Sequence, residues 1–292
     1  SQKEGADTLV VLVHGLGGSA GNWLEVMGEL ARVGPVVAPD LPGFGRTEPP
    51  RPGASRIGAN LAFLRALLRH LDLGRVTVQG NSMGGMLSVL LAAAEQAAVE
   101  RLVLVDPALP GPRVRLGQLD RDTLRTFAPF SVPRLGHRVL GRRYAESTAE
   151  ELFDETQQLA FADPSRVRPP MRRLGLENTA YGMRTPWRLD GMAAAGQSLV
   201  ANLLHGGRLK RALDAVAAPT LVVWGDQDRL VGWPVIEATL ARRPDFELAV
   251  LDDVGHAPMI EAPDRFVATV LDFYARTGLG EPREIPLRSR HA

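Results

Sequence analysis

Val76-Thr77-Val78-Gln79-Gly80-Asn81-Ser82-Met83-Gly84-Gly85 decides the fold, because a buried strand, a glycine-flanked serine and a helix follow one another there. Residues 76–79 are an apolar, β-branched run that predicts a strand, and the spacing of apolar residues in 86–93 predicts a helix. Residues 80–84 fit G-x-S-x-G, a sharp turn that exposes a serine, with glycines where side chains would collide. A plain Gly-Ser turn in which Ser82 caps the helix is the alternative.

The remainder of the chain alternates short β-branched runs with helix-period segments. This alternation is typical of a mostly parallel sheet flanked by helices. The predicted strands are residues 9–13, 36–38, 76–79, 102–105 and 221–224. Apolar side chains on one face predict a helix over 57–71, and Pro234 and Pro263 each suit the first turn of a later helix.

The strand pattern stops between residues 107 and 216, where prolines separate short helical pieces. This interruption predicts a helical cap inserted into an α/β core. We therefore expect a core of residues 1–110 and 216–280, and a helical cap of residues 111–215. Residues 281–292 carry arginines and prolines without periodicity, which predicts a disordered tail.

Charge and cysteine content exclude several classes of protein. Thirty-four basic and 33 acidic residues nearly cancel, and outside the tail no basic stripe is interleaved with aromatics, which argues against a nucleic-acid partner. The chain has no cysteine, so a thiolate nucleophile and a cysteine-ligated zinc are excluded. No apolar stretch reaches the roughly 18 residues of a membrane span.

The start of the chain is polar and lacks the apolar region of a signal peptide. We therefore expect a cytoplasmic protein with a small-molecule substrate. Removal of a leader before Ser1 stays open, as does the oligomeric state.

A serine hydroxyl needs a neighbouring base to become a nucleophile. Of the six histidines, His256 is the best candidate, because it lies in a loop between the apolar run 248–251 and the last predicted helix. In an open parallel sheet, such a loop lies at the carboxyl edge of the strands, where sites form. An ordinary loop histidine exposed to water is the alternative.

The base in turn needs a carboxylate that orients it. Asp226 and Asp228 both follow the predicted strand 221–224, and we favour Asp228 because Asp226 is better placed to accept hydrogen bonds from turn amides. Asp106, at the end of the predicted strand 102–105, is the rival acid.

Two backbone amides are candidates for the oxyanion hole. The N–H of Met83 would open a helix, and the N–H of Leu16 lies in a glycine-rich loop after the first strand. That loop fits neither dinucleotide nor phosphate-binding motif, and the histidines lack metal-ligand spacing, so we expect no cofactor and no metal.

Together these segments resemble the α/β-hydrolase superfamily over residues 8–110 and 216–276. The matching motifs are His14-Gly15, Asp40-Leu41-Pro42-Gly43-Phe44-Gly45, Gly80-Asn81-Ser82-Met83-Gly84-Gly85, Gly225-Asp226-Gln227-Asp228 and Gly255-His256. The resemblance implies an α/β-hydrolase fold with a Ser82, Asp228 and His256 triad. It also implies an oxyanion hole formed by Leu16 and Met83.

Within the superfamily, a serine nucleophile favours esterase-like members over haloalkane dehalogenases and epoxide hydrolases. The turn around Ser82 also resembles that of the meta-cleavage carbon–carbon hydrolases, in which a cap arginine binds an acidic dienoate. Arg184 or Arg188 would take that part here. Ala257 follows His256 where that branch commonly has Trp, which favours the esterase interpretation.

We therefore predict a serine hydrolase that cleaves a carboxylic ester of a small to medium apolar substrate through an acyl-enzyme. The alternatives are a carbon–carbon hydrolase of meta-cleavage type and a hydrolase-fold small-molecule receptor. Gly15, Asn81 and Trp187 are the candidates for substrate contact. Apolar side chains of the cap either line the pocket or form the cap's own core: Phe127, Phe130, Phe153, Phe161, Met171, Met183 and Trp187.

Overall fold

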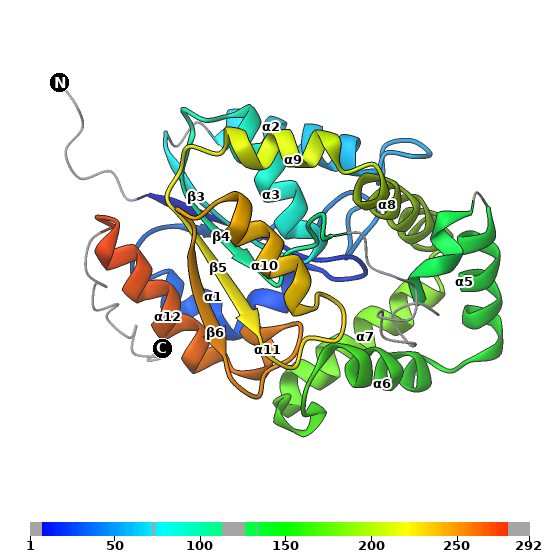
Figure 1. Ribbon diagram of the computed structural model, residues 1–292. Helices are drawn as coiled ribbons and strands as arrows, with labels where there is room; N and C mark the ends of the chain where they lie inside the picture. The colour runs from blue at the N-terminus through cyan, green and yellow to red at the C-terminus, as the bar shows by residue number, and fades with distance from the viewer. Residues whose placement is uncertain (1–7, 72–73, 113–125, 133, 280–292) are drawn as a thin grey trace.

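The computed structural model describes residues 8–71, 74–112, 126–132 and 134–279. A six-stranded sheet forms the centre of the molecule, with every strand pair parallel, in the order β2-β1-β3-β4-β5-β6 (Figure 1). The strands are β1 (Leu9–Val13), β2 (Val36–Val37), β3 (Val76–Asn81), β4 (Val99–Val105), β5 (Thr220–Gly225) and β6 (Glu247–Leu251). The order reverses direction between β1 and β3, and ligand sites of open parallel sheets lie at such a point.

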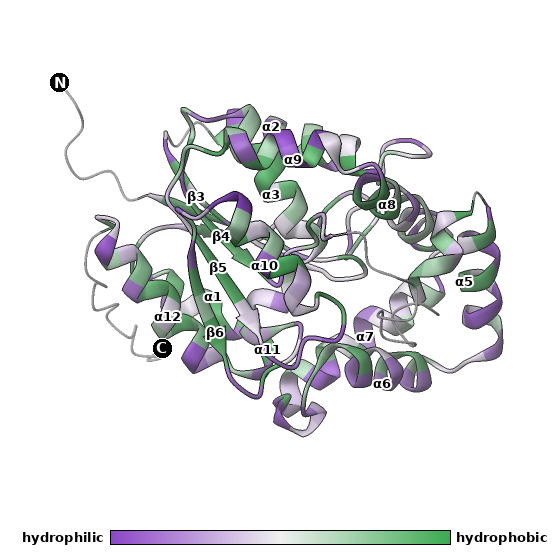
Figure 2. Cartoon of the chain, in the orientation of Figure 1, coloured by the Kyte–Doolittle hydropathy of each residue, from purple (hydrophilic) through white to green (hydrophobic). Residues whose placement is uncertain are grey.

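Alternate side chains of each strand enter two separate hydrophobic cores, as the two-residue period of a strand requires. Leu9, Val11 and Val13 pack on one face, whereas Val10 and Leu12 pack on the other. β1 is accordingly apolar along its whole length, and the central strands β3, β4 and β5 are largely apolar (Figure 2). A sheet covered on both faces explains why the sequence shows continuous apolar runs.

Helices cover both faces of the sheet. Residues of α2, α3, α9 and α10 contribute to the first core, and residues of α1, α11 and α12 to the second. The bounds are α1 (Leu24–Leu30), α2 (Ile57–Leu71), α3 (Met83–Ala94), α9 (Gly207–Ala215), α10 (Trp233–Arg242), α11 (Pro258–Glu261) and α12 (Pro263–Arg276), with the 3₁₀ turn η1 (Ala20–Trp23) before α1.

Between β4 and β5 the chain forms a group of helices that we call the insertion. It comprises η3 (Ala128–Ser131), α5 (Leu135–Glu146), α6 (Ala149–Ala160), η4 (Pro164–Arg166), α7 (Pro169–Met183) and α8 (Pro186–Leu204). Figure 1 places it beyond the carboxyl ends of the strands, on the side away from both termini. Phe130 packs against Gly136 and Gly196, and Phe153 against Gly175, so these two rings form part of the insertion's own core.

The predicted fold class is confirmed. Every predicted strand is present, although 36–38 shortens to Val36–Val37 and 102–105 begins earlier, at Val99, while the run 248–251 forms most of β6. Residues 207–215, within the expected cap, form α9, which packs on α3 of the core. The expected tail of residues 281–292 lies outside the described residues. In the described segments, no helix is both long and apolar enough to cross a membrane.

Candidate functional site

Ser82 lies in a strained turn between β3 and α3. Its backbone has φ 55° and ψ −116°, outside the regions that non-glycine residues normally occupy. The strand and helix approach each other so closely here that a Cβ at Gly80 would collide with the carbonyl oxygen of Gly84. A Cβ at Gly84 would collide with the carbonyl oxygen of Val13. The two glycines therefore permit the turn that holds Ser82 at the end of β3.

The glycine-rich loop after β1 passes directly beside the serine. A Cβ at Gly15 would lie 3.2 Å from the Cβ of Ser82 and 3.1 Å from Oδ1 of Asn81. Met83 is the first residue of α3, where backbone N–H groups lack helical partners, and Leu16 follows Gly15 in the loop. Met83 and the loop that contains Leu16 thus both adjoin Ser82, and their use as oxyanion donors stays a prediction.

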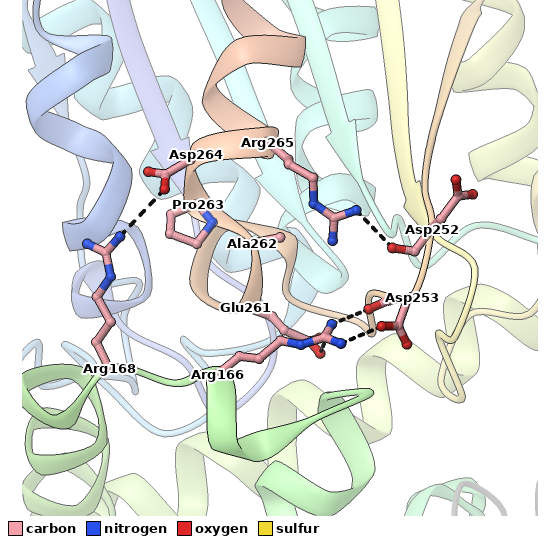
Figure 3. A pocket seen from close by; sticks show the side chains of 9 residues that line it. All are labelled: Arg166, Arg168, Asp252, Asp253, Glu261, Ala262, Pro263, Asp264 and Arg265. Atoms are coloured by element: carbon pink, nitrogen blue, oxygen red, sulfur yellow. Dashed lines mark hydrogen bonds and ion pairs between the residues drawn. The ribbon is translucent and has the colours of Figure 1, made fainter.

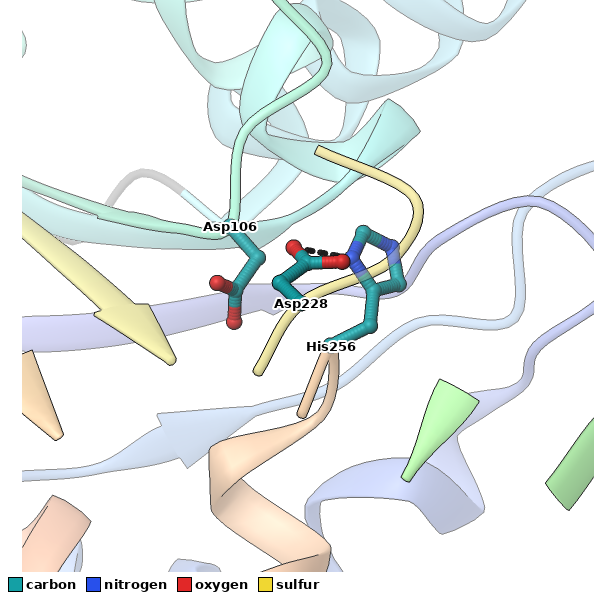
Figure 4. Close-up of side chains that lie close together, drawn as sticks. All are labelled: Asp106, Asp228 and His256. Atoms are coloured by element: carbon teal, nitrogen blue, oxygen red, sulfur yellow. Dashed lines mark hydrogen bonds and ion pairs between the residues drawn. The ribbon is translucent and has the colours of Figure 1, made fainter. Parts of the chain in front are cut away.

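His256 and Asp228 form a buried hydrogen-bonded pair. Nδ1 of His256 and Oδ2 of Asp228 are 2.7 Å apart, and both side chains are almost fully excluded from solvent (Figure 4). The other carboxylate oxygen, Oδ1, accepts from the backbone N–H groups of Leu230 at 2.7 Å and Val231 at 3.0 Å. With Nδ1 bonded to the carboxylate of Asp228, Nε2 is the ring nitrogen of His256 that stays available as a proton acceptor.

Asn81 connects the serine turn to the histidine loop. Its Nδ2 donates to the backbone oxygen of His256 at 2.9 Å and to that of Val105 at 3.3 Å. Asn81 is buried at the end of β3, directly before Ser82. The side chain predicted to contact substrate therefore also bonds to backbone within the protein.

Asp106, the rival acid, lies beside this pair instead of replacing it. Its Oδ1 accepts from the N–H of Gly225 at 3.0 Å, and its side chain is completely buried. Burial and the neighbouring charge of Asp228 raise the pKa of Asp106 well above its ordinary value. Asp226 was predicted to accept hydrogen bonds from turn amides, and its Oδ1 accepts from the backbone N–H of Asp253 at 2.6 Å.

Asp106, Asp228 and His256 are also the candidates for holding a metal. Their nearest ligand-capable atoms all lie within 4.8 Å of one another, a proximity that the spacing in the sequence does not reveal. The 2.7 Å bond between His256 and Asp228 already uses one ligand-capable atom of each of these two side chains. The hydrogen-bonded pair is the simpler use of these groups.

His14 braces the loop beside the serine and has no ring nitrogen left for chemistry. Its Nδ1 donates to the oxygen of Gly15 at 2.8 Å, and its Nε2 accepts from the N–H of Leu41 at 3.0 Å. Complete burial lowers the pKa of His14 to about 4, so the ring is neutral at pH 7. The loops after β1 and β2 are thus held together by a neutral imidazole.

Helix α8 of the insertion packs onto these same loops through residues that sequence reasoning missed. A Cβ at Gly191 would lie only 2.6 Å from the carbonyl oxygen of Gly43, so the helix approaches that loop more closely than any side chain would allow. The side chain of Met192 is 3.6 Å from the Cβ position of Gly17, in the loop beside Ser82. A glycine inside a helix was the available signal, because it often marks close packing.

Arg188 of α8 ties the insertion to the loop after β2. It is buried, and its guanidinium donates to the oxygen of Gly45 at 2.7 Å and to Oδ1 of Asn178 at 3.1 Å. Arg184, the other predicted arginine, is exposed at the end of α7. Trp187 packs edge to face on Tyr181, with ring centroids 6.3 Å apart, inside the insertion. Its contact with substrate stays a prediction.

A second group of charged residues joins the insertion to the histidine loop around a cavity of about 410 Å³ (Figure 3). Arg166 forms ion pairs with Asp253 and with Glu261, the latter at 3.6 Å. Arg168 lies 3.8 Å from Asp264, so these two arginines are both paired with carboxylates that line the cavity. We interpret the cavity as a structural junction.

Comparison with known proteins finds the same fold and related enzymes. The family model described as alpha/beta hydrolase fold matches residues 8–263. A 2-hydroxy-6-oxononadienedioate/2-hydroxy-6-oxononatrienedioate hydrolase of Cupriavidus pinatubonensis is 30% identical over 276 residues, which cover 92% of this chain and 87% of that protein. A hydrolase of the same description from Pseudomonas putida is 31% identical over 274 residues, with 92% and 88% covered.

Among solved structures, the 2-hydroxy-6-oxo-6-phenylhexa-2,4-dienoate hydrolase of a Rhodococcus species has a TM-score of 0.72 at 23% identity, with 92% of this chain and 91% of that chain covered. A thermophilic esterase of Thermogutta terrifontis also has a TM-score of 0.72 at 23% identity, with 94% and 91% covered. At this identity the two structures bear on the fold alone.

Proposed function

Because the chain belongs to the α/β-hydrolase family, we propose that it is a hydrolase. Ser82 is the nucleophile, His256 is the base, and Asp228 is the carboxylate that orients His256. The observation that carries this proposal is the buried 2.7 Å bond from His256 to Asp228, joined through Asn81 to the strained turn of Ser82. Asp228 holds the imidazole with Nε2 available, which is the form that a base requires.

The reaction starts when Oγ of Ser82 attacks a carbonyl carbon and His256 takes the hydroxyl proton. The N–H groups of Met83 and Leu16 stabilise the negative charge that develops on the carbonyl oxygen. The scissile bond then breaks, His256 gives the proton to the leaving group, and an acyl group remains on Ser82. Water attacks the acyl-enzyme with His256 again as base, which releases a carboxylic acid and restores the serine.

For the substrate, we propose a 2-hydroxy-6-oxo-dienoate in which the leaving group is carbon, in place of the ester that the sequence favoured. The support comes from the curated relatives, which are 30% and 31% identical over nearly the whole chain and are described as hydrolases of such dienedioates. A dienoate carries at least one carboxylate, which a buried cation near the serine would bind.

Arg188 is the cation that fits this requirement. Its guanidinium is buried, reaches the loop after β2, and lies close enough to His14 to influence that ring, which in turn contacts Gly15 beside Ser82. Two of its partners, Gly45 and Asn178, are neutral acceptors, so the positive charge is not cancelled by a direct ion pair with them. We propose that Arg188 attracts the substrate carboxylate under the insertion, which acts as a cap.

An ester substrate is the second candidate, and Ala257 favours it. Ala257 directly follows His256 and is buried, where the carbon–carbon hydrolases commonly carry a tryptophan. The small residue leaves the histidine loop without that indole. An apolar acyl or alcohol group would then occupy the space beside the imidazole.

Steady-state hydrolysis of two coloured probes distinguishes the candidates. One is 2-hydroxy-6-oxo-6-phenylhexa-2,4-dienoate, and the other is a p-nitrophenyl ester of acetate or butyrate. We expect the wild type to have the larger kcat/KM for the dienoate, Arg188→Gln to raise KM for the dienoate alone, and Ser82→Ala to remove both activities.

The matched control is Ser88→Ala, which lies in α3 between one and two helical turns after the nucleophile. The Ser88 hydroxyl donates to the oxygen of Gly84 and has no proposed part in catalysis, so its removal should leave kcat/KM nearly unchanged. A larger kcat/KM for the esters would favour the second candidate. Stoichiometric binding of either probe without turnover by the wild type would instead indicate a receptor.

A further inference from the structure

One carboxylate oxygen of Asp106 lacks the hydrogen bond that a buried oxygen normally has. Oδ2 of Asp106 is buried and has no hydrogen-bond partner among the described residues, although its other oxygen accepts from Gly225. Buried polar atoms normally have partners, since desolvation without a hydrogen bond costs free energy. An orphaned carboxylate oxygen at the centre of a candidate active site therefore needs an account.

A second carboxyl group, that of Asp228, lies close to the carboxyl group of Asp106. Oxygen atoms of Asp106 and Asp228 lie within 4.8 Å of each other and of a ring nitrogen of His256, and Figure 4 shows the three side chains close together. Two ionised carboxylates cannot hydrogen-bond to each other, because neither has a proton to donate. One proton between them would satisfy the orphaned oxygen.

The hydrogen-bond donors around each carboxyl decide which one carries this proton. Asp228 accepts three bonds, from His256, Leu230 and Val231, and each of them stabilises the ionised form. Asp106 accepts a single bond, from the N–H of Gly225. The charge is therefore held far better on Asp228, and the proton belongs on Asp106.

The charges around Asp106 act in the same direction. Burial raises the pKa of Asp106 well above 3.8, and the negative charge of Asp228, with a smaller effect of Glu261, raises it further. The backbone of Asp106 has φ 43°, a left-handed conformation that is uncommon for a residue other than glycine and that holds this side chain at the end of β4. Strained residues of this kind cluster at functional sites.

We propose that Asp106 is a positioning residue that stays protonated at neutral pH and donates a hydrogen bond to Asp228, so that one negative charge, not two, faces His256. The additional donor fixes the plane of the Asp228 carboxylate. Asp228 can then orient the imidazole without taking its proton. A second ionised carboxylate would instead favour the protonated imidazole and suppress the base at neutral pH.

This inference rests on the proposed function only where it concerns rates, because the proton itself can be observed without turnover. The infrared spectrum of the wild type at pH 7 should contain the C=O stretch of a protonated carboxyl group. This band should shift when H₂O is replaced by D₂O. The band should disappear in Asp106→Asn and remain in Asp226→Asn, the matched control in the same loop as Asp228. Thermal unfolding of each variant establishes that it is folded.

A band that survives in Asp106→Asn and disappears in Asp228→Asn would overturn the proposal, and so would the absence of any such band from the wild type. Labelling the wild type with [4-¹³C]aspartate shifts the band if an aspartate carries the proton. This labelled measurement needs no variant, and a band that does not shift would overturn the proposal even if Asp106→Asn does not fold.

Rates supply the second readout, with p-nitrophenyl acetate or a fluorophosphonate as the probe. Asparagine retains both the acceptor and a donor, so the acid limb of the rate profile of Asp106→Asn should lie within about 0.3 pH unit of the wild type. Asp106→Leu removes the donor and should lower kcat by about tenfold or more. If Asp106→Asn moves the acid limb by about one unit or more to lower pH, the wild-type carboxyl is ionised and the proposal fails.

If the wild type neither turns over the probes nor is labelled, but shows the infrared band, the proposed function is refuted and the proposal of a protonated Asp106 stands. If Ser82→Ala abolishes the activity but no infrared band depends on Asp106, the proposed function stands and the proposal of a protonated Asp106 is refuted.

Discussion

The backbone N–H of His256 donates to the carbonyl oxygen of Ala160 across 2.6 Å, which bonds the histidine loop directly to the end of α6. The insertion therefore does more than lie over the site, because its backbone forms part of the support of the proposed base. Glu261 strengthens the same junction. Its buried carboxylate accepts from the N–H groups of Gly255, Ala162 and Asp163 at 2.7, 3.2 and 2.8 Å.

We expect Glu261→Gln to weaken this junction. The amide offers one oxygen where the carboxylate offers two, and its NH₂ group would face backbone donors, so the free energy of unfolding should fall by about 2–3 kcal/mol. Denaturant unfolding measures this change, and kcat should fall with it. Glu247→Gln is the control, because Glu247 pairs with Arg276 at the surface and should matter by less than about 1 kcal/mol. Equal effects of the two changes would contradict the junction.

Asn81 should matter through its bond to the backbone oxygen of His256. Asn81→Leu leaves that oxygen and the oxygen of Val105 without this donor, which should destabilise the fold by about 1–3 kcal/mol and lower kcat more than it raises KM. Asn81→Asp tests the donor itself, since the carboxylate of aspartate cannot donate. A rise in KM at constant kcat would show that Asn81 only binds substrate.

His14 should make stability depend on pH below 6.5. Its folded pKa is about 4 against 6.5 for the free imidazole, so between these values the unfolded chain binds the extra proton. By linkage the fold loses stability as the pH falls through this window, by about 3 kcal/mol in total. This contribution is complete above pH 6.5 and absent from His14→Asn. Denaturant midpoints of both proteins between pH 7 and 4 test it, and parallel curves would contradict it.

The close packing of the serine turn should show in a pair of glycine substitutions. Gly84→Ala places a methyl group against the backbone oxygens of Val13 and His14, which cannot move without opening the sheet, so we expect a loss of several kcal/mol or a failure to fold. Gly28 in α1 has nothing within 4 Å of its Cβ position, and Gly28→Ala should stabilise the protein by about 1 kcal/mol. Thermal unfolding compares them, and similar midpoints would refute the close approach.

Local patterns in the sequence were sufficient for the sheet and the serine turn. Strands such as β1 are continuous apolar runs, and the glycine at 80 reports a steric requirement that acts within five residues, since its Cβ position meets the carbonyl oxygen of Gly84. The pairing of His256 with Asp228 could be proposed because both residues follow strands at the same edge of the sheet.

The contacts that join distant segments could not be predicted in this way. Asp106 was visible as a rival acid. The surroundings of its unpartnered oxygen, however, depend on how close Asp228 lies in space, and Asp228 is 122 positions further along the chain. Glu261 and Met192 have no motif of their own, since their importance comes from partners in other elements. The substrate class likewise depended on relatives, because a triad acts on many kinds of carbonyl compound.

The most direct test of the central claim is active-site labelling with a fluorophosphonate, followed by mass spectrometry of the intact chain and of its peptides. We expect one adduct per chain, located on Ser82, absent from Ser82→Ala and slowed at least about a hundredfold in His256→Ala. Labelling of another residue, or labelling at an equal rate in the His256 variant, would contradict the account of Ser82 as a nucleophile activated by His256 and Asp228.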